Sequence, residues 1–318
     1  MKKIIGGYFE LELLKGREFH PDAIRLNTGR NAFEYILRAK NYKKVYLPYY
    51  TCDVMLEPIL KLALKHEFYS IDKTFRPLFD FKKIKSDEVF VYNNYFGICD
   101  SQVKEVASIC SNIIIDNSQA FYSKPLPGVD TLYSPRKFFG LPDGAYLYTA
   151  SKLGIDIEQS VSYQRMEHLL GRLDIGAEEF YRSFKENSTA LCGLPIQKMS
   201  NLTLSLLKSI DYSSVARKRR ANYLFIDNHI KNRNQIQINF EENTVPMVYP
   251  YLVENGKALK RKLIENKIFI PTFWPNVIKW ADENSWEFHL SSELVLLPVD
   301  QRYDPSLLGS IVRLIQHS

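Results

Sequence analysis

Short apolar runs alternate with amphipathic segments through the first 116 residues of the chain. The apolar runs are continuous and rich in β-branched and aromatic residues: VYLP (45–48), FYSID (68–72), EVFVYNNYFG (88–97) and NIIID (112–116). Between them lie three segments with helical spacing: AFEYILRAK (32–40), DVMLEPILKLALKH (53–66) and SQVKEVASIC (101–110). Continuous apolar strands are typical of a sheet that helices cover on both faces. The sequence therefore predicts an α/β fold with a large, mostly parallel sheet.

The later part of the chain has a different pattern. DTLYS (130–134) and GAYLYT (144–149) have no helix between them, so we expect them to pair antiparallel around a turn. Amphipathic helices follow from about residue 156. A smaller α/β unit comes last, with strands expected at 245–253 and 268–273 and helices at 256–267 and 305–316.

These patterns predict two domains. We place the boundary near Asp211, which gives a large domain over residues 1–210 and a small C-terminal domain over residues 211–318. Residues 1–26 lack clear periodicity, and we interpret them as an N-terminal arm.

Composition excludes several classes of protein. The 42 basic and 36 acidic residues leave a net charge of +6 that is spread along the chain, so nucleic acid is not an expected partner. The basic run at 217–220 has no interleaved aromatic residues, and we interpret it as the solvated face of a helix. The four cysteines have no C-x-x-C spacing and the six histidines are scattered, so neither a disulfide framework nor a metal site is expected. We expect no signal peptide and no membrane span, and a cytoplasmic protein.

Three side chains between residues 112 and 149 are candidates for chemistry. Asp116 closes an apolar strand, and in doubly wound sheets the carboxyl ends of strands face the ligand crevice. Gln119 follows three residues later, and Lys137 lies in the turn SPRKFFGLPDG. Each has an ordinary alternative, namely a turn-initiating aspartate, an exposed glutamine and a surface lysine. Together they are also the groups that a pyridoxal phosphate (PLP) site needs.

The neighbours of Lys137 favour the catalytic alternative. Phe138, Phe139 and Leu141 would be unusual on an exposed turn, so we expect an apolar pocket around the amine. Burial of this kind disfavours the charged ammonium and makes the amine a competent nucleophile.

A second group of residues suits a phosphate. Thr28-Gly29-Arg30-Asn31 begins a helix and offers free backbone N–H groups, the positive end of the helix dipole and one guanidinium. Ser134, at the spacing S-x-x-K before the lysine, can add a hydroxyl. The alternatives are simple capping of the helix and a turn serine before a proline. Candidates to line the same site are Tyr49, Tyr50 and Tyr95.

In this order, the segments resemble the DegT/DnrJ/EryC1/StrS family of PLP-dependent sugar aminotransferases, as a shortened and divergent member. LNTGRNAFEYILRA is similar to the family's opening Ser/Thr-Gly segment and first helix, and IIIDNSQAF to its E-D-A-A-Q-A segment. YSPRKFFGLPDGAYLYT is similar to its Schiff-base lysine and the Gly/Asp-Gly turn that follows. The likeness covers most of the chain. It implies the fold of type I PLP-dependent transferases (the aspartate aminotransferase fold) and a homodimer with sites near the interface.

The resemblance also implies a role for each candidate. Lys137 would carry PLP, Asp116 would pair with the ring nitrogen, and Gln119 would contact the ring hydroxyl. The phosphate would be served by Gly29, Arg30, Asn31 and Ser134.

The chain departs from the family pattern in four places, one of which is that the family's serine usually lies further from the lysine than Ser134 does. Cys52 stands where the family has an aromatic residue that stacks on the ring, and Tyr50 is the candidate replacement. The family's Asn-Tyr-Arg segment, which reaches the neighbouring subunit's phosphate, has no clean counterpart around Cys192–Ser200. The chain is also shorter between Asp116 and Lys137.

The predicted function is transamination. An amino donor, expected to be glutamate, would give its amino group to a keto substrate, expected to be a nucleotide-linked sugar used for cell-surface polysaccharides or secondary metabolites. Three alternatives stay open: a sugar dehydratase, which in this family has histidine in place of the lysine; a non-catalytic or regulatory PLP-binding protein; and an aminotransferase unrelated to carbohydrates.

Overall fold

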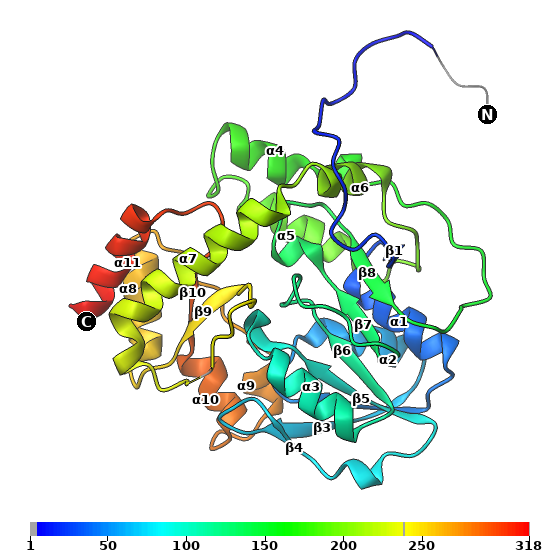
Figure 1. The fold of residues 1–318 in the computed structure, drawn as a ribbon, viewed down its shortest axis with the longest axis horizontal. Coiled ribbons are helices and arrows are strands. Elements are labelled where there is room, and N and C mark those ends of the chain that lie inside the picture. The colour runs from blue at the N-terminus through cyan, green and yellow to red at the C-terminus, as the bar shows by residue number, and fades with distance from the viewer. Residues whose placement is uncertain (1–4, 238, 318) are drawn as a thin grey trace.

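The computed structural model describes residues 5–237 and 239–317, and an eight-stranded sheet forms its centre (Figure 1). The strand order is β1-β8-β7-β6-β5-β2-β3-β4. The strands are β1 (Ile24–Leu26), β2 (Lys44–Pro48), β3 (Lys65–Ile71), β4 (Pro77–Leu78), β5 (Glu88–Asn93), β6 (Ile113–Asp116), β7 (Asp130–Tyr133) and β8 (Ala145–Tyr148).

The predicted α/β class and mostly parallel sheet are confirmed. Strands β3, β2, β5, β6 and β7 run parallel to one another, whereas β1, β4 and β8 pair antiparallel with their neighbours. The antiparallel pairing of β7 with β8 is as expected from the absence of a helix between them. Every residue of β5, β6 and β7 is buried, which explains why these strands read as continuous apolar runs.

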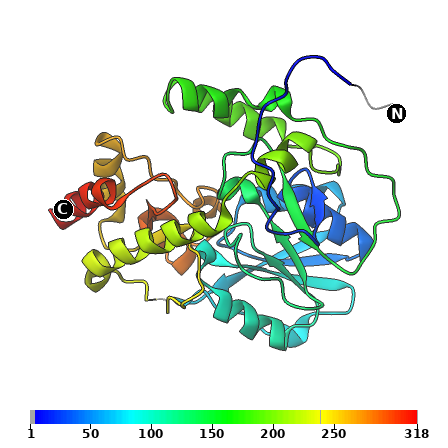
Figure 2. The same ribbon diagram turned by 45° about the horizontal axis from the view of Figure 1, so that its top comes forward.

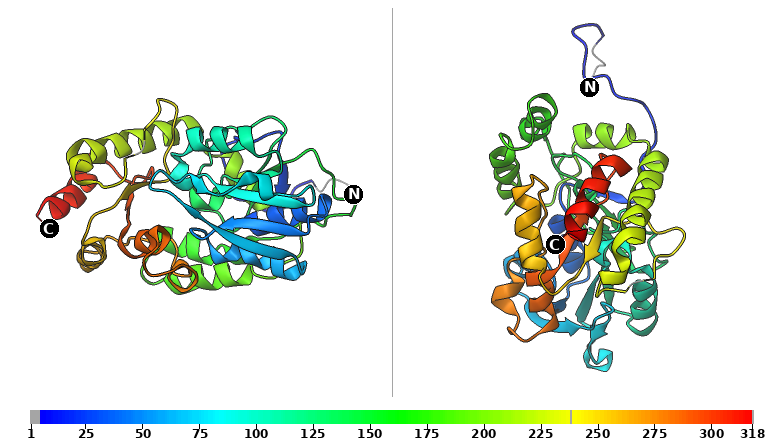
Figure 3. Two further views of the ribbon diagram at one scale, coloured as in Figure 1. Left: turned by 90° about the horizontal axis from the view of Figure 1, so that it is seen from below. Right: turned by 90° about the vertical axis from the view of Figure 1, so that its left-hand side faces the viewer.

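Different helices cover the two faces of the sheet (Figures 1 and 3). On one face, α1 (Gly29–Ala39) and α2 (Leu56–Lys61) pack on inward-facing strand residues that include Val45, Val91 and Ile114. On the other face, α3 (Asp100–Ile109) packs on alternate residues that include Phe90 and Ile115. The side chains of successive strand residues point to opposite faces, so each strand contributes to both cores.

A linking group of helices follows the sheet: α4 (Glu167–Asp174), α5 (Tyr181–Ala190) and α6 (Asn201–Lys208). The long helix α7 (Tyr212–Ile230) then leads into a second, two-stranded antiparallel sheet of β9 (Val248–Tyr251) and β10 (Val295–Pro298). This sheet is accompanied by α8 (Gly256–Glu265), α9 (Val277–Trp280), α10 (Trp286–Glu293) and α11 (Pro305–Gln316). These elements share one hydrophobic core with the α3 face of the large sheet.

Several expected elements are wrong in detail. Residues 268–273 form no strand; Pro271 has no N–H for a ladder, and this sheet instead uses Val295–Pro298, which was not predicted. The helix expected over 53–66 ends at Lys61, and its last residues form the start of β3. The expected arm contains β1, which is too short to show a periodicity. Residues 1–4 of that arm lie outside the described residues.

No helix within the described residues is long and apolar enough to cross a membrane.

The packing of α1 on the sheet gives a test of this fold. Ile36 is fully buried against the sheet, so Ile36→Ala should lower the free energy of unfolding by about 2–5 kcal/mol because it leaves a cavity. Leu60→Ala on α2 is the matched control: Leu60 is 64% exposed, and its truncation should change the stability little. Urea denaturation of both variants would measure the difference.

Candidate functional site

The candidate residues meet at one edge of the large sheet. Strands β5, β6 and β7 are parallel, so their carboxyl ends lie at the same edge, where β6 ends in Asp116 and β7 is followed by Ser134. Strand β1 is antiparallel to β8, which is antiparallel to β7, so β1 also ends at this edge and leads into α1. Strands β3 and β4 are added on one side of β2, whereas β5, β6 and β7 are added on its other side, so the order of the strands switches between β2 and β5. Open α/β sheets bind ligands at such switch points.

Lys137 ends the single turn Pro135–Lys137 that follows β7. Its amine lies 5.7 Å from the centroid of the Phe273 ring, which belongs to the C-terminal part of the chain. Phe138, Phe139 and Leu141 are buried as expected, but they pack into the core beneath the turn and leave Lys137 exposed. The prediction of an apolar pocket around the Lys137 amine is therefore wrong for a single copy of the chain.

Asp116 is buried at the end of β6 and faces this lysine. Burial raises the pKa of the Asp116 carboxyl, while hydrogen bonds from Ser118 and the positive charge of Lys137 act in the opposite direction. Its Oδ1 accepts a hydrogen bond from the Ser118 backbone N–H at 2.8 Å. Lys137 acts in the same way on Cys52, where burial raises the pKa of the thiol and the lysine charge lowers it. Lys137 thus lies near both Asp116 and Cys52.

Gln119 is also buried beside the site. Its amide Oε1 accepts a hydrogen bond from the Phe96 backbone N–H at 2.8 Å. This contact fixes the orientation of the amide and leaves its nitrogen without a hydrogen-bond partner among the described residues. The Gln119 side chain can therefore donate to a ligand acceptor.

The start of α1 forms a small cradle. A Cβ atom placed on Gly29 would lie 3.8 Å from both the Ser118 hydroxyl oxygen and the Ser134 Cβ, so the two serines border the space beside this glycine. Thr28 caps the helix by accepting a hydrogen bond from the Asn31 N–H at 3.1 Å. The N–H groups of Gly29 and Arg30 have no partner in the described part of the chain. Sequence reasoning missed Ser118, whose only signal is its place between Asp116 and Gln119.

The side chains of Arg30 and Asn31 do not face this cradle openly. Arg30 donates to Glu57 at 2.8 Å, and Glu57 also accepts a hydrogen bond from the Gly193 N–H. Asn31 is buried and donates to the carbonyl of Leu194 at 2.9 Å. Both side chains thus hold the 193–194 loop. The expectation that these residues serve a phosphate is limited to the backbone N–H of Arg30, because the backbone N–H of Asn31 donates to Thr28.

Tyr50 lies beneath the site. Its ring is fully buried and packs against Trp274 and Tyr95, with centroid distances of 4.9 and 5.7 Å. The expected replacement of the stacking aromatic residue by Tyr50 is therefore wrong, because a fully buried ring presents no face to a ligand. Cys52, which is half-buried, is the residue that lies near Lys137 at this position.

Arg136 is a cation with no partner. It stands directly before Lys137, its Nε is shielded from solvent, and no residue in the described part of the chain forms a hydrogen bond or ion pair with it. Burial lowers the pKa of Arg136 to about 10; Asp143 opposes this shift, and the positive charges of Arg30 and Arg165 add to it. A shielded, unpaired guanidinium is costly and favours an anion nearby.

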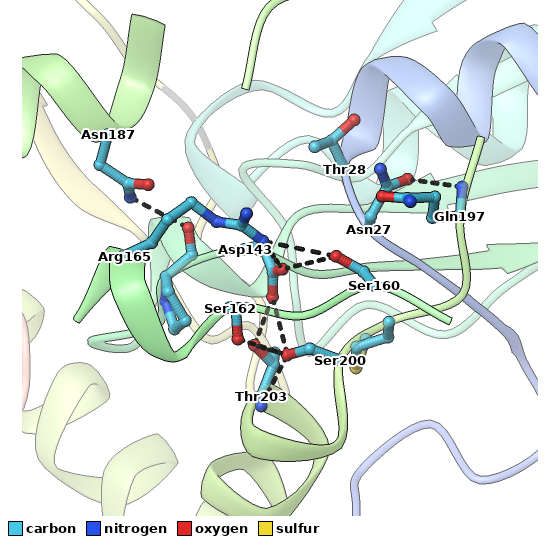
Figure 4. A network of polar contacts seen from close by, with 12 residues as sticks. Asn27, Thr28, Asp143, Ser160, Ser162, Arg165, Asn187, Gln197, Ser200 and Thr203 are labelled. Carbon is cyan, nitrogen blue, oxygen red and sulfur yellow. Dashed lines mark hydrogen bonds and ion pairs between the residues drawn. The ribbon is translucent and has the colours of Figure 1, made fainter. Parts of the chain in front are cut away.

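The far end of the lysine turn is anchored by a buried polar network (Figure 4). The fully buried Asp143 carboxylate accepts hydrogen bonds from Arg165 at 2.6 Å, from Ser200 at 3.4 Å and from the Thr203 hydroxyl. The next residue, Gly144, has a φ of +113° and donates to the Asn27 carbonyl, so the turn is tied to the start of α1. The Asn27 side chain donates to the Pro195 carbonyl and accepts from the Gln197 N–H. The Cys192–Ser200 segment, which has no clean Asn-Tyr-Arg counterpart, is thus held by its own chain.

The interpretation of residues 217–220 as a solvated helix face is wrong for two of its arginines. Arg219 is 2% exposed and donates to backbone carbonyls, and burial lowers its pKa to about 10. Arg220 donates to the carbonyls of Glu241 and Thr244. The packing of α7 against these loops, which sequence periodicity does not reveal, decides which arginines are buried.

Comparison with known proteins identifies the fold. No model of a known protein family matches the chain, and no curated protein matches it. Solved structures match it over almost its whole length. The sugar aminotransferase CalS13 from Micromonospora echinospora has a TM-score of 0.65 at 15% identity, covering 94% of this chain and 88% of its own.

Two further structures agree. Spr1654 from Streptococcus pneumoniae, in its PLP form, has a TM-score of 0.67 at 15% identity and covers 93% of this chain and 86% of its own. A DegT DnrJ EryC1 StrS aminotransferase from Brucella abortus has a TM-score of 0.63 at 14% identity, with coverage of 93% and 85%. The chain therefore has the fold of PLP-dependent aminotransferases, as predicted.

The two buried aspartates of this site should respond oppositely to neutralisation. The folded-state pKa of Asp116 is raised, so its contribution to stability is present at low pH and is lost as the pH rises through the folded pKa. Asp116→Asn should therefore stabilise the ligand-free protein at pH 7, with a gain that shrinks in acid. Asp143→Asn should destabilise it by about 3 kcal/mol, because Arg165 loses its counter-charge.

Urea denaturation of both variants at pH 7 and at acidic pH would measure these effects. A loss of stability at pH 7 for Asp116→Asn would contradict the burial of an unpaired carboxylate at the end of β6.

Proposed function

We propose that this chain is a PLP-dependent aminotransferase of the DegT/DnrJ/EryC1/StrS type. The observation that carries the proposal is the convergence of Lys137, Asp116 and the Gly29 cradle at one edge of the sheet. The three groups match the three reactive parts of the cofactor: an aldehyde, a ring nitrogen and a phosphate. Their order along the chain and the fold both support the same assignment.

The residues present fit this cofactor. The space beside Gly29 is bordered by Ser118 and Ser134 and faces unpaired N–H groups at a helix start, which suits a phosphate. Arg136 adds an unpaired positive charge on the same turn as Ser134. When bound, PLP supplies an electron-accepting ring and an aldehyde that condenses with amines.

Each protein group then has a task. The exposed amine of Lys137 would hold the cofactor and, once an amino donor has released it, would act as general base and acid towards the substrate carbon. The Asp116 carboxylate would pair with the protonated ring nitrogen, and its burial would strengthen this charge interaction. Without a cationic partner, the same burial makes the ionised carboxylate energetically unfavourable. The Gln119 amide, whose oxygen accepts from the Phe96 N–H, would donate through its nitrogen to the ring hydroxyl.

The substrate assignment rests on the neighbours of the fold. CalS13 is named as a sugar aminotransferase, and we propose a keto sugar linked to a nucleotide as acceptor and glutamate as donor. Lys137 argues against the dehydratase alternative, because the dehydratases of this family have histidine in place of the lysine. The binding-protein alternative draws on Cys52, which offers no ring for stacking on the cofactor.

We also propose that the chain acts as a cytoplasmic homodimer. Large apolar side chains are exposed on the N-terminal arm, which extends away from the body (Figure 2), and on α4 and its following loop. They include Tyr8 at 99%, Phe9 at 94% and Leu173 at 88% exposure. A second copy that covers these residues would remove apolar surface from water.

The first test concerns Lys137. The purified protein with PLP should show the visible absorbance band of a lysine-bound cofactor, and glutamate should convert it to the aminated form. Lys137→Ala should abolish both the band and turnover, while Lys124→Ala, at an exposed lysine outside the site, should keep them. Absence of any band in the wild-type protein with added PLP would refute cofactor attachment, and a band without conversion would favour the binding-protein alternative.

The second test concerns the phosphate. If Arg136 pairs with it, Arg136→Met should weaken PLP binding about 10- to 100-fold, as expected for a charge-assisted hydrogen bond. Binding of pyridoxal, which lacks the phosphate, should not change. Arg182→Met, at an arginine whose side chain is 90% exposed, is the control. Equal weakening of PLP and pyridoxal would assign Arg136 to structure instead.

A further inference from the structure

The peptide that follows Lys137 is held by two side chains from the C-terminal part of the chain. The Phe138 carbonyl accepts hydrogen bonds from Arg219 Nη2 at 3.2 Å and from Gln301 Nε2 at 3.0 Å. Arg219 also donates through Nε to Gln301 Oε1 at 2.9 Å, and its guanidinium stacks 4.5 Å from the centroid of the Phe138 ring. Arg219 and Gln301 therefore fix both the backbone and the ring of the residue next to the lysine.

The other edge of the same guanidinium faces a second part of the site. Arg219 Nη1 donates to the carbonyls of Pro246 and Met247 at 3.2 and 3.0 Å. The Met247 N–H in turn donates to the Phe96 carbonyl at 2.8 Å, and the Phe96 N–H donates to Gln119 Oε1 at 2.8 Å. One chain of hydrogen bonds thus connects the turn of Lys137 to the side chain of Gln119.

Close packing reinforces this connection. A Cβ atom on Gly97 would lie 2.7 Å from the Gln119 carbonyl oxygen and 3.0 Å from that of Val245, so the three backbone segments touch here. Gly97 has a φ of +72°, a conformation that glycine adopts without strain. The 245–247 segment therefore cannot shift relative to Gln119 without breaking these contacts.

The chemistry of the guanidinium suits this role. Arg219 is 2% exposed, and its guanidinium donates to the Gln301 amide oxygen and to three backbone carbonyls. A lysine ammonium in the same place lacks the planar fork that can reach Phe138 and Met247 together. The arginine thus acts as a rigid spacer between two backbone segments.

We propose that Arg219, with Gln301, is a positioning residue that sets Lys137 relative to Gln119 and so aligns the amine with the bound cofactor ring. This inference rests on the proposed function for its catalytic consequence, although the hydrogen-bonded connection itself does not. It extends the site to α7 and to the loop after β10, which hold no residue in contact with the reacting groups.

The test compares a substitution of Arg219 with a substitution of Arg233. Arg219→Met should leave PLP attached to Lys137 but slow the conversion by glutamate about 10- to 100-fold, because small misplacements of a reacting group have effects of this size. It should also shift the pH midpoint at which the absorbance maximum of the lysine-bound cofactor changes. Arg233→Met is the control: Arg233 also donates to a backbone carbonyl, that of Ile315 at 3.3 Å, but forms no hydrogen bond with the turn of Lys137 or with the 245–247 segment within the described residues, so the rate and the pH midpoint should stay within about twofold of wild type.

Hydrogen–deuterium exchange separates this inference from the proposed function. Without any cofactor, Arg219→Met should speed amide exchange in both segments 134–144 and 117–122, and Arg233→Met should speed it in neither. If Arg219→Met fails to fold, Gln301→Leu is the milder substitution, and it should speed exchange in 134–144. Equal behaviour of the Arg219 and Arg233 variants in exchange would overturn the proposal, even if the wild-type protein binds PLP. A wild-type protein without a PLP band would refute the proposed function and leave the exchange result to decide the connection.

Discussion

The candidate site depends on one constraint, which is that parallel strands end at the same edge of a sheet. Strands β5, β6 and β7 run in one direction, so the residues that follow them lie at the same edge of the sheet although they are up to 40 positions apart in the chain. The antiparallel strands β8 and β1 bring the start of α1 to the same edge. A carboxylate, a lysine and a helix start then face each other without any long loop.

Buried charges mark how this edge is supported. Asp143 is paired with Arg165 and hydroxyl groups, and Arg219 is surrounded by carbonyls, so both can leave water at moderate cost. Asp116 accepts a hydrogen bond from Ser118 but forms no ion pair within the described residues, and Arg136 forms neither a hydrogen bond nor an ion pair there. Asp143 and Arg219 hold the turn of Lys137 in place, whereas a ligand group of opposite charge would stabilise Asp116 and Arg136.

Local patterns predicted the large sheet well because its strands are buried on both faces and its helices have a clear apolar stripe. The same reasoning failed where partners are distant. Val295–Pro298 is a strand because Val248–Tyr251 lies beside it, and Arg219 is buried because Phe138 and Met247 present their carbonyls to it. By sequence, Tyr50 is a candidate to line the site and stack on the cofactor, but Trp274, more than 200 residues later, packs against its ring.

By itself, the sequence determined the α/β class, the candidates Asp116, Gln119 and Lys137, and the helix start at Thr28, because each depends on residues within a few positions of one another. Only the tertiary structure decided which side chains are free to act. The side chains of Arg30 and Asn31 are hydrogen-bonded to Glu57 and to the Leu194 carbonyl, and Ser118 borders the space beside Gly29. Arg219 connects the turn of Lys137 to the segment that holds Gln119. These outcomes depend on hydrogen bonds and burial between distant segments, which no local pattern encodes.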